Sequence, residues 1–142
     1  MELTTGLDLA SRVHRSVLVT LRGDGRPQLS NVLHQRAGDG ELRISTTTER
    51  AKYANLSRRP WAALHVASED FWAYAVLEGE VELSAPAAQP DDATVEELVD
   101  YYRSLSGEHD DWPAYRRAMV AEHRVVVRLH PQRAYGNAGA SS

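Results

Sequence analysis

The sequence contains no cysteine and a single lysine, Lys52, although it is rich in arginine. The absence of cysteine excludes disulfides, thiolate catalysis and cysteine-based zinc sites. No apolar run reaches the roughly 20 residues that a membrane-spanning helix needs. The first residues also lack the basic-then-apolar pattern of a signal peptide. We therefore expect a cytoplasmic protein with no membrane partner.

Several catalytic motifs are missing as well. There is no P-loop, no Gly-x-Ser-x-Gly and no His-Glu-x-x-His. The six histidines are scattered without the spacing of metal ligands, which predicts no metal site. If the protein is an enzyme, a bound cofactor has to carry the chemistry.

What is present fits one domain over residues 1–142, with a loose tail over 138–142. Hydrophobic residues make up 42% of the chain, enough for a core, and the net charge of -4 argues against nucleic acid. The charge is uneven, because residues 49–59 carry four cations against one acid and residues 91–111 carry eight acids against one arginine. A local basic patch on an acidic protein suits a small anionic ligand better than a polymer.

The pattern of the chain is mainly β. Two Gly-Asp-Gly turns separate three extended segments, which we interpret as a meander of three antiparallel strands. Pro60 is expected to stop a short helix, and an acid at position 91 or 92 to cap a longer one. The expected helices span 7–14, 51–58, 93–105 and 112–122, and the expected strands span 17–21, 26–35, 42–46, 61–67, 71–83 and 124–129. Six or so antiparallel strands predict a small β-barrel with peripheral helices and argue against a Rossmann fold.

The segment from Ser45 to Leu56 has the components of a phosphate-binding site. Arg50 and Lys52 are two residues apart, so their side chains converge in extended chain and diverge in a helix. The two side chains therefore converge only if the helix begins after about Arg50. Thr46 and Glu49 have capping-box spacing, and Thr47 or Thr48 could also cap the helix. Free backbone N–H groups at such a start favour an anion. An ordinary capped helix with solvated cations is the alternative interpretation.

A second segment, residues 25–32, is extended and unusually polar for a central strand. Gln28 and Ser30 lie on one face of it, and Asn31 lies on the other. Short hydrogen-bonding side chains at the mouth of a barrel can line a ligand site. The two segments together favour a bound phosphorylated cofactor.

In order and spacing, these segments resemble the split β-barrel family of pyridoxamine 5'-phosphate oxidase-like flavin and deazaflavin proteins. The resemblance rests on Val19-Thr20-Leu21 with residues 25–32, on Arg50-Ala51-Lys52 with Asn55-Leu56 and Pro60, and on residues 72–79. Residues 95–126 are similar to the actinobacterial branch that uses the deazaflavin coenzyme F-420. The chain ends without the arginine-histidine substrate motif of the oxidases proper, so vitamin B6 oxidation is not expected.

The resemblance implies a six-stranded antiparallel split barrel of the FMN-binding type. It also implies a homodimer with cofactor sites at the subunit interface. Arg50 and Lys52 would hold the cofactor phosphate, and Trp72 and Tyr74 would wall the site or simply pack at the core or interface. The full set of expected cofactor-binding residues is Gln28, Ser30, Asn31, Ser45, Thr47, Arg50, Ala51, Lys52, Asn55, Trp72 and Tyr74.

The leading hypothesis is an oxidoreductase that uses reduced coenzyme F-420 to reduce an electron-poor small-molecule substrate. No catalytic side chain is assigned, because the sequence does not decide between Tyr74 and solvent as the proton donor. An FMN flavoprotein of the same fold is the first alternative, and a non-catalytic cofactor carrier is the second. Arg58 and Arg59 weakly favour F-420, the cofactor with the longer anionic tail. The alternative is that they are solvated cations at the end of a helix, where positive charge opposes the negative end of the dipole.

Overall fold

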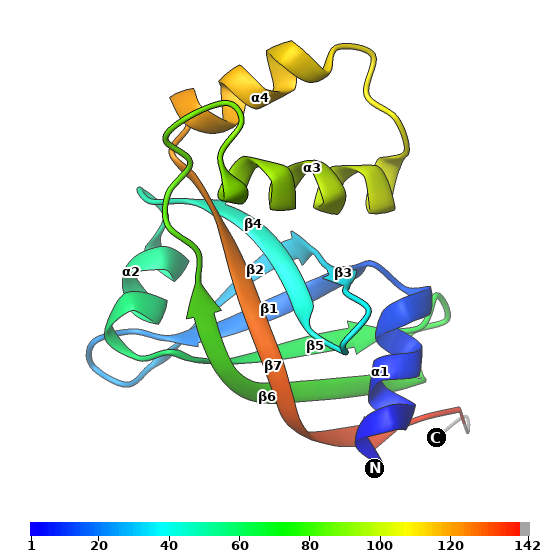
Figure 1. Cartoon of the computed structure of the whole chain (residues 1–142). Helices are drawn as coiled ribbons and strands as arrows, with labels where there is room; N and C mark the ends of the chain where they lie inside the picture. Colours follow the sequence, from blue (N-terminus) through cyan, green and yellow to red (C-terminus); the bar gives the residue numbers. More distant parts are fainter. Residues whose placement is uncertain (140–142) are drawn as a thin grey trace.

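The computed structural model describes residues 1–139, which form one curled antiparallel sheet with four helices around it (Figure 1). The seven strands of this part of the chain lie in the order β2-β1-β5-β6-β7-β4-β3. This is the predicted split barrel, with one strand more than the six expected. The strands are β1 (Arg15–Leu21), β2 (Pro27–Leu33), β3 (Gln35–Arg36), β4 (Leu42–Thr47), β5 (Trp61–Ala67), β6 (Tyr74–Leu83) and β7 (Arg124–Asn137). The helices are α1 (Leu3–Arg12), α2 (Ala51–Arg58), α3 (Ala93–Ser106) and α4 (Trp112–Ala121).

The core lies inside the curl of the sheet. Strand β1 alternates between buried and half-buried positions, as a strand with one face on the core should. Leu18, Leu64 and Leu77 are fully buried and belong to one hydrophobic cluster with residues of α1 and α2. The opposite face of the same strands carries the half-buried and exposed residues, and the candidate site lies there and at the barrel end.

The meander prediction is wrong for the third strand. β1 pairs with β2, but β4 pairs with β7 on one side and with β3 on the other. The segment expected as one extended stretch over 26–35 breaks at His34, and the chain then crosses to the other side of the barrel. Local turn signals do not reveal such a crossing, because it depends on pairing with a strand eighty residues further along.

Strand β7 is longer than its predicted end at residue 129. It runs on to Asn137 and pairs with the whole of β6. Proline has no N–H to donate to a neighbouring strand, so Pro131 would be unfavourable inside a regular ladder. The register between β6 and β7 shifts between Glu78 and Gly79, and Pro131 lies at this bulge, where a ladder hydrogen bond is not needed. A Cβ at Gly79 would collide with the backbone of residue 130, so this crossing of strands requires glycine.

Helix α1 begins at Leu3, four residues before its predicted start. Thr4, Thr5 and Gly6 are weak helix formers, and their local preference hides the first turn. Tertiary packing decides the outcome, since a Cβ at Gly6 would lie 3.0 Å from Leu77 and 3.1 Å from Ala134. Glycine thus allows α1 to approach β6 and β7 closely.

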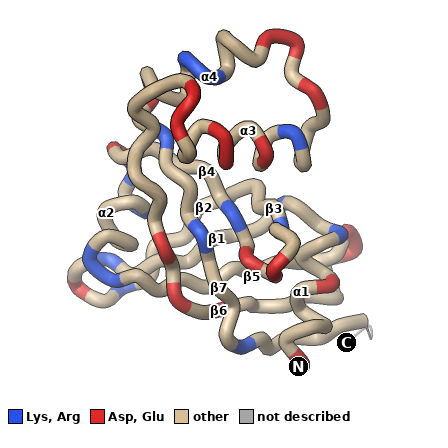
Figure 2. The backbone as a smooth tube through the Cα atoms, in the orientation of Figure 1, with Lys and Arg blue, Asp and Glu red and all other residues tan. Residues whose placement is uncertain are grey.

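Helices α3 and α4 form a hairpin over one end of the sheet (Figure 1). Their small core consists of Val95, Leu98, Met119 and Val126, with neighbouring apolar residues. Asp92 caps α3 by accepting a hydrogen bond of 2.9 Å from the Val95 N–H, as expected. Figure 2 shows acidic positions along α3 and in the loop after it, and basic positions at α2. In residues 1–139, no helix has the length and apolarity to cross a bilayer.

Candidate functional site

The site is organised by the start of helix α2. Arg50 is the N-cap, with extended backbone angles (φ -80°, ψ 148°), and the helix proper begins at Ala51. This confirms that Arg50 lies in the entering loop, as its spacing from Lys52 requires. The capping prediction is wrong, because no side chain caps this helix. Its first N–H groups are therefore not taken up by a capping side chain.

Arg50 and Lys52 line a pocket of about 260 Å³ at this end of the barrel. Arg124, from the start of β7, lines the same pocket, so three cationic side chains surround one space. We call this space the basic pocket. Its other lining residues are Asn31, Val32, Leu33, Ser45, Thr46 and Tyr101. Among residues 1–139, no aspartate or glutamate lines it.

The electrostatics of the basic pocket show that its cations are close together. Burial lowers the pKa of Lys52, and the charges of Arg50 and Arg124 lower it further. Arg124 has one acidic partner, Glu122, at 2.8 Å, and it lies 3.4 Å from the Ser45 hydroxyl, to which it donates. In the described chain, neither Arg50 nor Lys52 has a carboxylate within ion-pair distance. An anion bound here would relieve this repulsion.

Arg124 and Tyr101 are site residues that sequence reasoning missed. The register of β4 and β7 places Arg124 opposite Thr47, beside the hydroxyl-rich segment. Tyr101 reaches the pocket from α3 and donates a hydrogen bond of 2.6 Å to the Leu33 carbonyl. Burial raises the pKa of Tyr101 to about 12, so this side chain stays neutral at physiological pH. Nothing in the local sequence around either residue indicates a binding role.

Four of the predicted site residues meet in the basic pocket: Asn31, Ser45, Arg50 and Lys52. Gln28 and Asn55 instead contact each other, with Asn55 Nδ2 2.9 Å from Gln28 Oε1. Asn55 is buried, donates to Thr20 at 3.0 Å and accepts from Arg58 at 2.7 Å. These bonds join α2 to β1 and β2 and hold the helix in place.

The other predicted residues lie outside the basic pocket. Thr47 is buried in β4, Ala51 is exposed at the helix start, and Ser30 is half-buried opposite Leu18. Trp72 and Tyr74 line a separate pocket of about 240 Å³ with His65, Phe71 and Asn137. Trp72 belongs to the β5–β6 turn and not to β6, since Phe71 takes a φ of 80° there. Trp72 is 56% exposed in the single chain.

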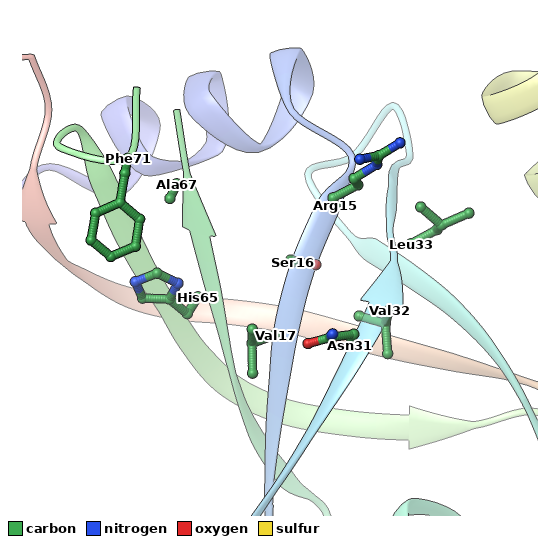
Figure 3. Close-up of a pocket in the computed structure, with 9 residues that line it drawn as sticks. All are labelled: Arg15, Ser16, Val17, Asn31, Val32, Leu33, His65, Ala67 and Phe71. Carbon is green, nitrogen blue, oxygen red and sulfur yellow. The ribbon is translucent and has the colours of Figure 1, made fainter. Parts of the chain in front are cut away.

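A third pocket connects these two groups of residues. It has a volume of about 520 Å³, and Figure 3 shows Phe71 and His65 on one side of it and Asn31, Val32 and Leu33 on the other. We call it the large pocket, because it is the largest of these three. It shares residues 31–33 with the basic pocket, and it shares His65 and Phe71 with the pocket of Trp72. The three pockets therefore adjoin through shared lining residues.

The curled sheet, with a basic pocket at the start of α2, defines the protein as a split β-barrel protein. More specifically, residues 8–138 match the pyridoxamine 5'-phosphate oxidase family, and the chain belongs to that family. Within residues 1–139, no group of three histidine, aspartate or glutamate side chains is placed to hold a metal ion.

Solved structures agree with this assignment. One described as an F-420 reductase has a TM-score of 0.67 and 28% identity, with 90% of this chain and 94% of that chain covered. A conserved hypothetical protein, Rv2991 from Mycobacterium tuberculosis, has a TM-score of 0.74 and 21% identity, with coverages of 97% and 85%. A heme binding protein from Mycobacterium smegmatis has a TM-score of 0.70 and 18% identity, with coverages of 99% and 55%. The last two likenesses concern the fold alone.

Proposed function

We propose that the protein is an oxidoreductase that uses reduced coenzyme F-420 to reduce a small-molecule acceptor. The observation that carries the proposal is the basic pocket, in which Arg50, Lys52 and Arg124 face one space that no carboxylate lines within residues 1–139. The 28% identity to the F-420 reductase supports the choice of cofactor. A phosphate site alone would suit FMN equally well.

In this proposal, each group of residues has the role that its position allows. Arg50, Lys52 and Arg124 bind the cofactor phosphate, and Ser45 adds a hydroxyl donor. Residues 31–33 are common to the basic pocket and the large pocket, so a cofactor held by its phosphate reaches the large pocket across them. When bound, the reduced deazaflavin supplies a hydride, and the acceptor gains that hydride and one proton. The chain's own contribution is positioning.

The proposal includes a homodimer. Leu29 and Leu33 are 60% and 49% exposed, and Tyr135 is 53% exposed. Asn31 lies on the same side of β2 as these two leucines. The strand registers connect Asn31, through partners in β1, β5 and β6, with Tyr135 in β7. Because register partners point to the same side of a sheet, the three apolar residues share its outer face. A second copy packed on this face would cover them and would border the large pocket. Sedimentation of the wild type and of Leu29→Glu checks this, and a monomeric wild type contradicts it.

Two titrations test the cofactor. The purified chain is titrated with F-420 and, separately, with FMN, and the quenching of each cofactor's fluorescence is followed. We expect F-420 to bind at least tenfold more tightly than FMN. Tight binding of FMN without binding of F-420 would overturn the proposal in favour of a flavoprotein.

Turnover then distinguishes an enzyme from a carrier. Reduced F-420 is mixed with a panel of quinones and activated alkenes, and the return of oxidised F-420 absorbance is recorded. We expect protein-dependent oxidation with at least one acceptor class. Tight binding of F-420 without turnover across the panel would instead indicate a cofactor carrier.

A further inference from the structure

We propose that the large pocket binds an acceptor that combines a flat apolar body with an anionic group, and that Arg15 binds the anionic group. This inference rests on the proposed function, because it names the substrate class of the same site. It goes further by assigning a specificity-determining residue outside the basic pocket.

The walls of the large pocket are mostly apolar. Val17, Val32, Leu33, Ala67 and Phe71 line it, and Phe71 is 63% exposed in the single chain. The volume of about 520 Å³ exceeds what a small polar molecule needs and falls within the range of ligand pockets. Apolar walls with an aromatic side chain favour a flat ring system over a sugar or a peptide.

Arg15 is the charged residue of this lining, at the first position of β1. Figure 3 shows its guanidinium at one end of the pocket, away from Phe71 and His65. It lies opposite Leu33 in the β1–β2 register. Within residues 1–139, no carboxylate lies within ion-pair distance of Arg15. An arginine beside an apolar pocket and without an acidic partner is suited to a carboxylate or sulfonate on the ligand.

Further basic residues lie near Arg15. A neighbouring pocket of about 800 Å³ shares Arg15, Leu33 and Ala67 with the large pocket. Arg12 and His14 also line it, and Glu69 is its one acidic residue among those described. The end of the large pocket at Arg15 therefore opens towards further basic groups. A ligand with an extended anionic arm would fit this direction.

The two cationic groups are separate. The basic pocket holds Arg50, Lys52 and Arg124, whereas Arg15 lines only the large pocket and its neighbour. Residues 31–33 lie between them as the shared lining. A cofactor phosphate and an acceptor anion can thus be bound at once without competing for the same side chain. Removal of Arg15 should therefore affect the acceptor and not the cofactor.

Matched neutral and anionic probes test the assignment. Binding of 2-naphthoate and of 2-naphthamide, which share ring and shape, is measured calorimetrically on the full chain without added cofactor. We expect the wild type to bind naphthoate about tenfold more tightly than naphthamide. Arg15→Ala should abolish the preference, and Arg15→Lys should retain part of it. Arg22→Ala, which changes an exposed arginine just after the last residue of β1, serves as the control and should leave the preference unchanged.

Three results would overturn the inference. The wild type could show no preference for naphthoate over naphthamide, or the preference could survive in Arg15→Ala. That variant could also lose binding of both probes equally. A changed F-420 affinity in Arg15→Ala would also overturn it, because Arg15 would then belong to the cofactor site. Failure of the proposed function is distinguishable, since the naphthoate preference is measured without F-420.

Discussion

Strands β4 and β7 carry two groups of charged residues, one towards each end of their shared ladder. Towards one end, Arg43 and Arg128 are register partners, and at the other Arg124 lies opposite Thr47. Arg43 lies 3.1 Å from Glu41 and 3.3 Å from Glu97, and Arg128 Nε donates to Glu97 at 2.8 Å. In the basic pocket, Arg50 and Lys52 have no such acids within the described residues.

The difference separates arginines that pair with an acid of α3 from Arg50 and Lys52, which have no acidic partner within residues 1–139. The hydrogen bond from Arg128 lowers the pKa of Glu97, so both partners are stabilised in their charged forms. Neighbouring cations and burial act in the opposite sense on Lys52, whose charged form is disfavoured. Balanced charges join α3 to the sheet, whereas the unbalanced group stores repulsion that an anion would relieve.

The largest expected effect comes from the unbalanced group. Lys52→Ala should weaken cofactor binding by about 1.5–3 kcal/mol, the scale of a charge-assisted hydrogen bond. Its free energy of unfolding should change by less than about 0.5 kcal/mol, because a charge without a partner contributes little to folding. Cofactor titration and urea unfolding measure the two quantities. Arg117→Ala, an exposed cation on α4, is the control, and unchanged cofactor affinity in Lys52→Ala would contradict the basic pocket.

Substitution in the balanced group of Glu97, Arg43 and Arg128 should lower stability and leave cofactor affinity unchanged. Glu97→Ala should lower the free energy of unfolding by about 2 kcal/mol, because it leaves Arg43 and Arg128 half-buried beside each other without their shared acid. Urea unfolding checks this. Glu122→Ala is the matched control, since its pair with Arg124 is more exposed and should contribute less than about 1 kcal/mol. Equal losses in the two variants would break the comparison.

The buried, uncharged side chain of Asn55 gives a third test of which residues stabilise the fold and which bind the cofactor. Asn55→Ala should lower the free energy of unfolding by about 1–2 kcal/mol, because Thr20, Gln28 and Arg58 lose its hydrogen bonds. Ser57→Ala, on an exposed turn of the same helix, should have a smaller effect. A loss of cofactor affinity in Asn55→Ala without a loss of stability would instead return Asn55 to the cofactor site.

The smallest expected effect is a pH dependence. His34 is fully buried, with Nε2 2.9 Å from the Ala10 carbonyl and Nδ1 2.7 Å from the Ser16 hydroxyl, which suits the neutral ring. Burial lowers the pKa of His34 in the folded chain, so below about pH 6.5 the unfolded chain binds more protons there. Stability should therefore fall as pH drops below about 6.5. Unfolding at pH 5.5 and 7.5 should show a smaller difference in His34→Gln; an unchanged difference would contradict this.

Local patterns predicted most elements of the fold. The ranges of β5, α2 and α3 agree within a residue, because alternation, Pro60 and the Asp92 cap act over a few positions. The start of α1 and the second half of β7 were missed. Gly6 and Pro131 are locally unfavourable there, and only packing on β6 and a register shift make them acceptable.

For the site, the spacing of Arg50 and Lys52 predicted that the two side chains converge only if the chain is extended before α2, and Arg50 has that extended backbone. The sequence alone also placed Ser45 and Asn31 among the candidates. Only the tertiary structure brought Arg124 and Tyr101 to the same pocket, and it showed that Gln28 and Asn55 are bonded to each other. The physical reason is that strand pairing joins residues far apart in the chain, and no local pattern records which strands become neighbours.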